Sequence, residues 1–178
     1  MGKNWRRALL RSLSTAAALW LAGVAPGMAA DAGLAGDDPP FLSVAAGVFD
    51  ALHNNTAGEF RAEYRFADKL LIFKPFVGAF GTTDKSFYGY GGFRVDIYFG
   101  SRIVLMPNAA VGYFARGSGK NLGGPLEFRT GAELAWRFDD RSRLGLSFNH
   151  ISNAGIYKTN PGEEELAIVY SIPFDLLK

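Results

Sequence analysis

The fold is decided by one stretch of the chain, Leu126-Glu127-Phe128-Arg129-Thr130-Gly131-Ala132-Glu133-Leu134-Ala135-Trp136-Arg137-Phe138. Its even-numbered positions are mostly apolar, and most of its odd-numbered positions are charged or small. Successive side chains of a β-strand point to opposite faces, so a period of two over about a dozen residues predicts a strand with one apolar and one polar face.

The same alternation recurs at 59–66 and at 87–99, and division of the chain at its turn residues completes the pattern. Eight strands are predicted near 41–52, 58–67, 70–81, 86–99, 102–116, 125–138, 143–152 and 163–173. Tight turns at 67–69, 100–101 and 139–142 alternate with longer polar loops near 53–57, 82–85, 117–124 and 153–162. Short turns on one side and long loops on the other are typical of outer-membrane barrels. We therefore predict an all-β fold, an eight-stranded antiparallel, up-and-down transmembrane β-barrel with a polar lumen.

A soluble barrel such as a lipocalin would also alternate, and the chemistry of the two faces distinguishes the cases. One face carries the charged residues Arg61, Glu63, Arg65, Lys74, Arg94, Asp96, Arg129, Glu133 and Arg137. The interior of an eight-stranded barrel holds little more than side chains, so these groups are expected to pair across a narrow lumen. The opposite face is rich in Phe, Leu, Ile and Val, and Trp136 and Phe138 beside a tight turn suit an interfacial aromatic girdle. This distribution favours the membrane barrel.

The first 30 residues predict a cleaved signal peptide, because Lys3, Arg6 and Arg7 precede an apolar stretch over 9–24 that ends in small residues. This leader holds four of the 19 basic residues and none of the 17 acidic ones, so the rest of the chain has a net charge of −2. That balance does not suggest a nucleic-acid partner. The chain has no cysteine, so disulfides cannot stabilise it. Residues 31–40 predict a flexible lead-in and residues 41–178 the barrel, located in the bacterial outer membrane.

A polar cluster interrupts the apolar faces of the last two predicted strands. His150 and Ser152 share a face with Leu144, Leu146 and Phe148, and Glu164 shares one with Leu166 and Ile168. We expect the cluster on the lipid-facing wall, at the height of the outer-leaflet headgroups, where its substrate would be a lipid. In such a triad His150 removes the proton from Ser152, Glu164 orients the imidazole, and Ser152 attacks an acyl carbonyl.

The remaining polar groups nearby have weaker assignments. Asn153 and backbone amides near Ala154 and Gly155 could supply oxyanion donors. Asn160 heads an Asn-Pro-Gly turn, and a supporting role in the site competes with a purely conformational one. His53, in the first long loop, is predicted to be simply solvated. A different protein class remains open, a non-catalytic structural or lipopolysaccharide-binding barrel, as does an esterase, phospholipase or palmitoyl transferase that acts on another lipid.

The segment from Leu122 to Pro173 resembles the PagL family, the lipid A 3-O-deacylases of Gram-negative outer membranes. The family pattern, His-x-Ser-Asn-Ala followed by Asn-x-Gly-x-Glu, is met by His150, Ser152, Asn153, Ala154, Asn160, Gly162 and Glu164. The resemblance implies Ser152 as nucleophile, His150 as base, Glu164 as orienting acid and Asn153 near the oxyanion, with no metal or other cofactor.

These observations lead to one functional expectation. The protein is expected to be a membrane-embedded serine esterase that removes the 3-O-linked hydroxyacyl chain of lipid A, its partner being lipopolysaccharide in the outer leaflet. The sequence does not fix the oligomeric state, and a homodimer could gate the lipid-facing site by occluding it. The resemblance covers only the last third of the chain in detail, so the ester position is inherited from the family.

Overall fold

The computed structural model describes residues 32–33, 38–53 and 55–177. The predicted signal peptide at 1–30, and residues 31 and 34–37 of the predicted lead-in, lie outside these residues. Within the described ranges no helix has the length and apolar character that a membrane crossing requires.

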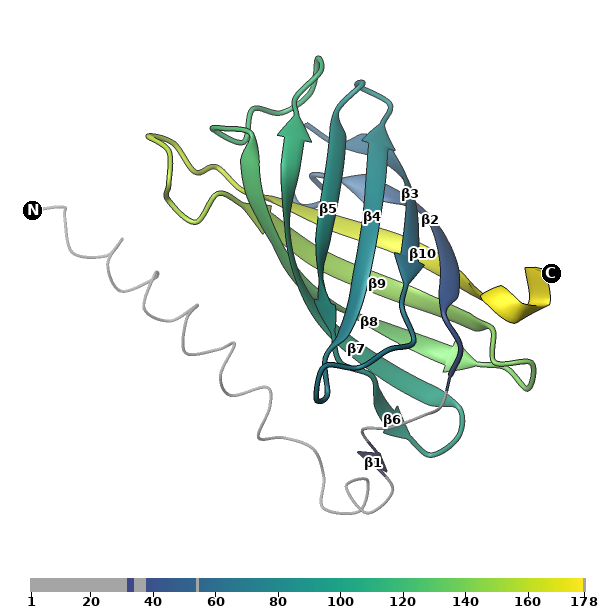
Figure 1. Cartoon of the computed structure of the whole chain (residues 1–178). Coiled ribbons are helices and arrows are strands. Elements are labelled where there is room, and N and C mark those ends of the chain that lie inside the picture. The colour runs from purple at the N-terminus through teal and green to yellow at the C-terminus, as the bar shows by residue number, and fades with distance from the viewer. Residues whose placement is uncertain (1–31, 34–37, 54, 178) are drawn as a thin grey trace, which may run out of the picture. The chain divides into compact units, whose positions relative to one another are not determined.

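The described chain is almost entirely β-structure (Figure 1). The strands are β1 (Ala32–Gly33), β2 (Phe41–Phe49), β3 (Ala57–Arg65), β4 (Lys74–Thr82), β5 (Phe87–Arg94), β6 (Ile97–Phe99), β7 (Ile103–Ala115), β8 (Leu126–Arg137), β9 (Arg143–Ser152) and β10 (Glu163–Pro173), followed by the 3₁₀ helix η2 (Phe174–Leu177). Consecutive strands pair antiparallel from β2 to β5 and from β7 to β10, β5 and β6 both pair antiparallel with β7, and β10 pairs antiparallel with β2. β5 and β6 pair with successive parts of β7 and together form one strand of the barrel. The predicted closed eight-stranded barrel is therefore confirmed.

The strand predicted at 86–99 is interrupted between β5 and β6. Arg94 lies opposite Asn108 and Ile97 opposite Leu105, so the register against β7 is the same on both sides of the break. Pro107 of β7 faces the break, and its carbonyl accepts a hydrogen bond from Val95 N–H at 3.0 Å. Because proline has no backbone N–H to donate, the hydrogen-bond ladder between this strand and β7 is interrupted here.

The strand predicted at 70–81 begins four residues later than expected. Leu70 and Phe73 exchange backbone hydrogen bonds of 2.8 and 3.0 Å, and Leu71 between them has a positive φ of 60°. These bonds close a tight turn, so β4 starts only at Lys74.

The barrel has two unlike ends, which Figure 1 shows towards the upper left and the lower right. Four connections, residues 50–56, 83–86, 116–125 and 153–162, lie at the end that we call the loop end. The connections 66–73, 100–102 and 138–142 and the helix η2 lie at the opposite end, the turn end, where the connection 66–73 is longer than the tight turn predicted at 67–69. The outer strand faces carry exposed apolar side chains along most of the wall, among them Val44, Phe60, Val77, Phe93, Val111, Leu134, Leu146, Phe148 and Ile168.

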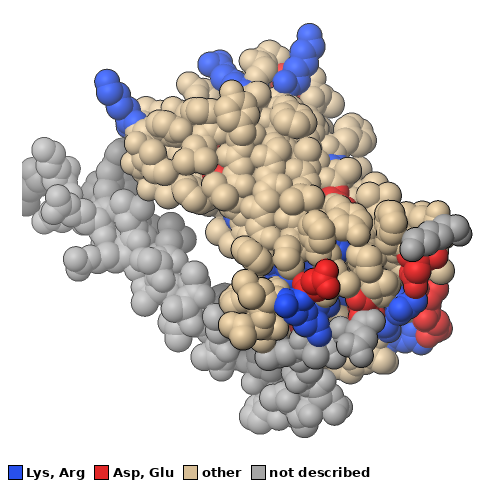
Figure 2. All heavy atoms as spheres, in the orientation of Figure 1, with Lys and Arg blue, Asp and Glu red and all other residues tan. Residues whose placement is uncertain are grey.

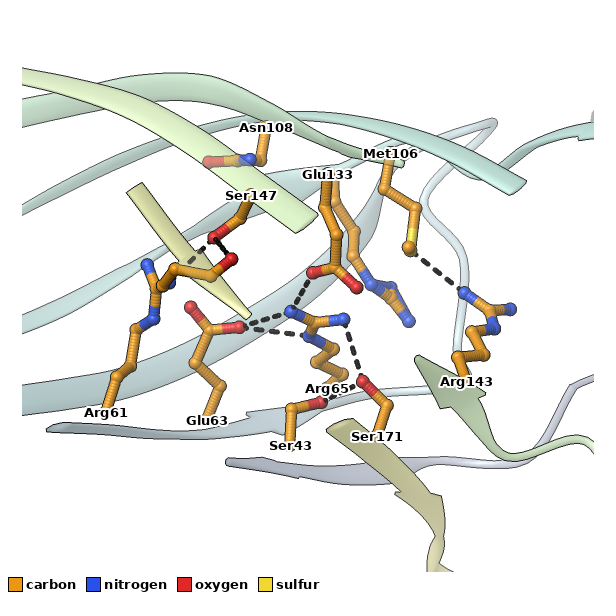
Figure 3. Close-up of polar contacts among 12 residues, drawn as sticks. Ser43, Arg61, Glu63, Arg65, Met106, Asn108, Glu133, Arg143, Ser147 and Ser171 are labelled. Atoms are coloured by element: carbon orange, nitrogen blue, oxygen red, sulfur yellow. Dashed lines mark hydrogen bonds and ion pairs between the residues drawn. The ribbon is translucent and has the colours of Figure 1, made fainter. Parts of the chain in front are cut away.

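The inner strand faces carry charged side chains that pair across the lumen (Figure 3). Arg65 is the best-connected example, with its guanidinium at 2.8 Å from a carboxylate oxygen of Glu63 and 2.6 Å from one of Glu133. Arg129 Nε lies 2.6 Å from Glu165. Eight of the nine charged residues predicted to face the lumen are buried, and the ninth, Arg137, is half-buried at the turn end. The polar lumen is therefore confirmed.

Asp38, at the end of the predicted flexible lead-in, is buried in the turn end of the barrel. Its Oδ1 accepts a hydrogen bond from Arg137 Nη2 at 2.7 Å, and its Oδ2 accepts from Arg143 Nη2 and Tyr98 Oη, each at 2.6 Å. Burial alone would raise the pKa of Asp38, but Arg137, Tyr98 and Arg143 outweigh it and lower that pKa to about 2. The local sequence, an aspartate followed by two prolines, does not predict these contacts, because the partner residues come from distant strands.

The lowered pKa of Asp38 predicts a pH-dependent contribution to stability. An unfolded aspartate has a pKa of about 3.9, so the ionised form stabilises the fold above about pH 4 and this contribution is lost as the pH falls towards about 2. Asp38→Asn should lower the free energy of unfolding by about 2 kcal/mol at pH 7 and by almost nothing near pH 2. Urea unfolding in detergent micelles, followed by tryptophan fluorescence, measures both values. Asp139→Asn, at an exposed site, is the control, and an equal loss at both pH values would contradict the assignment.

Candidate active site

His150 and Glu164 lie directly opposite each other on β9 and β10. Both side chains belong to the outer face, since their neighbours in sequence, Asn149, Ile151, Glu163 and Glu165, are buried. His150 Nδ1 is 3.2 Å from Glu164 Oε1. A carboxylate that accepts the Nδ1 hydrogen leaves Nε2 as the unprotonated nitrogen of a neutral imidazole. His150 is therefore arranged as a base whose Nε2 is available.

Ser152 ends β9 on the same outer face as His150 and is half-buried. The exposed side chains of Leu144, Leu146 and Phe148 precede the pair along this face. The polar pair thus continues an apolar stripe, as the alternation of the sequence predicted.

Two residues of β8 complete the surroundings and were not identified from the sequence. Phe128 lies opposite Ser152, and Thr130 lies opposite His150. The order of strands around the barrel places β8 beside the site. The register between β8 and β9 is also needed to place Phe128 and Thr130, and the sequence does not give that register.

Asn153 uses its side-chain amide to hold two loops together. Its side chain is fully buried, and Nδ2 donates to the backbone carbonyls of Leu122 at 2.7 Å and Thr159 at 2.9 Å. Both amide hydrogens are therefore committed to joining the loops 116–125 and 153–162. The side-chain amide for which an oxyanion role was expected thus has acceptors for both of its hydrogens, because loop conformation decides where the side chain points.

Asn160 and Gly155 take part in the same loop framework. Asn160 Oδ1 accepts a hydrogen bond of 3.0 Å from Asn153 N–H, and Asn153 Oδ1 accepts one of 3.0 Å from Gly155 N–H. Ala154, between them, has a positive φ of 53°, and its N–H donates to no residue in the described part of the chain. Asn160 and Asn153 therefore hold the backbone that follows Ser152.

Gly162 packs against the ring of His150. A Cβ atom built on Gly162 would lie 2.8 Å from His150 Cε1 and 3.3 Å from Nε2, and the φ of Gly162 is +63°. The Asn-Pro-Gly sequence predicts a turn, and in the structure Gly162 also leaves space for the imidazole ring of His150. Only a residue without a side chain allows the loop to approach the ring so closely.

Substitution at Gly162 should therefore disturb the chemistry more than the fold. Gly162→Ala is expected to lower kcat by about 10²-fold, because a shift of about 1 Å in a reacting group has that scale of effect. Gly155→Ala is the matched control, since Gly155 also has a positive φ, of 79°, but its added Cβ would meet nothing within 4 Å. Steady-state kinetics on a micellar lipid ester measures the difference. Equal losses in the two variants would mean that backbone strain, not the imidazole contact, is responsible.

His53 is not simply a solvated loop residue. Its Nδ1 lies 3.2 Å from Glu164 Oε2 and 3.2 Å from Asp50 Oδ1. The contact depends on barrel closure, because pairing of β10 with β2 brings the loop that follows β2 next to Glu164. The proximity of His53 to Glu164 could have been predicted from closure of the eight strands into a barrel. Among the described residues, no group of three or more His, Cys, Asp or Glu side chains has an arrangement that could hold a metal ion.

Comparison with known proteins gives one family and several similar folds. The model of the lipid A 3-O-deacylase (PagL) family matches residues 58–173. The crystal structure of the outer membrane enzyme PagL is similar with a TM-score of 0.61 and 20% identity, over 75% of this chain and 99% of that chain. No curated protein sequence matches the chain.

Two further solved structures share the barrel fold without close sequence similarity. A de novo designed transmembrane β-barrel has a TM-score of 0.57 and 11% identity, over 79% of this chain and 100% of that chain. Neisserial surface protein A has a TM-score of 0.52 and 9% identity, over 76% and 96%. The family match, in contrast, spans more than half of the chain and includes the facing pair His150 and Glu164 together with Ser152. The chain therefore belongs to the PagL family of lipid A 3-O-deacylases, ester hydrolases of the outer membrane.

Proposed function

We propose that the protein hydrolyses the 3-O-linked hydroxyacyl ester of lipid A through a triad of Ser152, His150 and Glu164. The observation that carries the proposal is the 3.2 Å contact between His150 Nδ1 and Glu164 Oε1 on the outer wall, with Ser152 two residues further along the same strand face. A base held by a carboxylate beside a hydroxyl is the arrangement that activates a serine nucleophile.

The reaction proceeds in two halves. His150 Nε2 takes the Ser152 hydroxyl proton while Oγ forms a bond to the acyl carbonyl carbon, and the imidazolium then gives that proton to the departing sugar oxygen. This step leaves an acyl-enzyme and a lipid A with a free 3-hydroxyl. In the second half, His150 removes a proton from water while the water oxygen attacks the acyl carbonyl carbon, and the bond between that carbon and Ser152 Oγ then breaks. The imidazolium returns the proton to Oγ, and the hydroxy fatty acid leaves. Glu164 stays ionised throughout and stabilises the imidazolium.

The tetrahedral intermediate needs a hydrogen-bond donor for its oxyanion. Both side-chain amide hydrogens of Asn153 are occupied, and the N–H groups of Asn153 and Gly155 donate within the loop. The Ala154 N–H has no acceptor in the described residues. We assign the oxyanion donor to Ala154, and we assign Asn153 and Asn160 to holding the backbone that presents it.

The surroundings of the site support a lipid substrate and a membrane-embedded barrel. Figure 2 shows few charged side chains on the middle of the visible wall, whereas Lys and Arg side chains protrude at the loop end. A barrel wall with this apolar band is suited to the hydrocarbon core of a bilayer. The site lies where β9 ends and β10 begins, at the loop end, so acyl chains would lie along the stripe of Leu146 and Phe148.

Mass spectrometry of lipid A tests the proposal directly. A Gram-negative host without its own 3-O-deacylase would express either the wild-type chain or Ser152→Ala, with barrel assembly checked by heat-modifiable gel mobility. We expect loss of one 3-hydroxyacyl mass with the wild type only. Unchanged lipid A with an assembled wild-type barrel would count against the activity, and phospholipid breakdown with intact lipid A would instead identify a phospholipase.

A further inference from the structure

Glu164 has two carboxylate oxygens, and the triad uses one of them. Oε1 faces His150, whereas Oε2 is buried and accepts no hydrogen bond of good geometry from the described residues. The group that faces Oε2 is His53, with Nδ1 at 3.2 Å. A buried carboxylate oxygen without a compensating partner is costly, so a nearby donor decides how this carboxylate is oriented.

The contacts of His53 favour a ring with a hydrogen on Nδ1. That nitrogen lies 3.2 Å from Glu164 Oε2 and 3.2 Å from Asp50 Oδ1, and two carboxylate oxygens at this distance would repel an unprotonated nitrogen. This holds for the neutral tautomer with Nδ1–H and for the imidazolium. The ring is half exposed, but the side of it that carries Nδ1 faces the two carboxylates.

The loop that carries His53 is anchored on β10. Asp50 is buried, and its N–H donates to Glu163 Oε2 at 3.1 Å. Its two carboxylate oxygens accept from Asn55 N–H and from Lys120 Nζ. Ala51 N–H donates to the Glu164 carbonyl at 2.9 Å. These bonds fix His53 relative to Glu164 through the backbone of both residues.

We propose that His53 is a positioning residue, which holds Oε2 of Glu164 so that Oε1 stays on His150. The inference rests on the proposed role of Glu164 in the triad. A carboxylate held at one oxygen can turn about its last side-chain bond, and a second contact from the opposite side removes that freedom. Among the described residues, the His53 ring makes its ion-pair contacts with Asp50 and Glu164 and none with Ser152.

Kinetics of the purified full-length protein in detergent micelles, with lipopolysaccharide as substrate, test the inference. His53→Ala should lower kcat about 10- to 100-fold and change KM less than about twofold, because the reacting groups are misaligned while substrate contacts remain. His53→Gln should recover part of kcat, since its amide can donate to Oε2. Added imidazole should raise the kcat of His53→Ala, because the ring position is half exposed, and should not raise that of Ser152→Ala.

The controls separate this inference from loop damage and from failure of the proposed function. Leu52→Ala changes an exposed neighbour in the same loop and should keep wild-type kcat. Wild-type kcat in His53→Ala, or a loss that neither glutamine nor imidazole relieves, would overturn the positioning role. If wild type and Ser152→Ala show the same absence of activity, the proposed function itself is wrong and this inference falls with it.

Discussion

Alanine at His150 is expected to lower kcat for lipid A deacylation by about 10⁶-fold, and alanine at Glu164 by only about 10⁴-fold, by analogy with measured serine-hydrolase triads. Loss of the base leaves the Ser152 hydroxyl protonated. Loss of the carboxylate leaves a base that is misoriented but present, and in this structure His150 sits on a strand whose backbone is paired on both sides. Single-turnover kinetics on micellar lipopolysaccharide measures both losses.

Tyr170→Phe is the matched control for these variants. Tyr170 lies on the outer face of β10 as Glu164 does, but near the turn end, so its kcat should equal that of wild type. Equal and complete loss in His150→Ala and Glu164→Ala, with both barrels assembled, would contradict the division of roles between base and orienting acid.

Removal of Arg65 from the lumen is expected to have the largest effect on stability. Arg65→Met leaves Glu63 and Glu133 without the guanidinium that lies 2.8 and 2.6 Å from them. Breaking a buried ion pair by removing one partner costs about 3–5 kcal/mol, since the remaining charge stays out of water. We expect the urea midpoint in detergent micelles to fall sharply and the heat-modifiable fraction to shrink.

Two further variants make this result interpretable. Arg102→Met removes an ion pair with Asp139 on the exposed turn and should cost less than about 1 kcal/mol. Adding Glu63→Gln and Glu133→Gln to Arg65→Met removes the unpaired charges and should restore most of the lost stability. A triple variant no more stable than Arg65→Met would mean that packing around the guanidinium, not charge, sets the cost.

The faces of the strands could be predicted from the sequence because side-chain alternation is a local property. Glu63 and Arg129 were correctly assigned to the lumen, and Leu146 and His150 to the other face, without any knowledge of the neighbouring strands. To predict that His150 faces Glu164, one further assumption was needed, namely that consecutive strands pair antiparallel, as they do in an up-and-down barrel.

The parts that could not be predicted depend on contacts between distant segments. The break at Val95 has its cause in Pro107 on the next strand, and the burial of Asp38 has its cause in three strands at the turn end. The side chain of Asn153 follows from how two loops meet. None of these residues has a local pattern that distinguishes it from an ordinary loop or strand position.

Closure of the barrel between β2 and β10 has a consequence for when the enzyme can work. Hydrogen bonds from Asp50 and Ala51 to Glu163 and Glu164 form only when the first and last strands of the barrel meet. A chain whose sheet is still open lacks these hydrogen bonds and the contact of His53 with Glu164, although the facing of His150 and Glu164 on β9 and β10 does not depend on closure. Full activity would then be reached only when the barrel has closed, which couples the efficiency of the enzyme to the completion of its assembly.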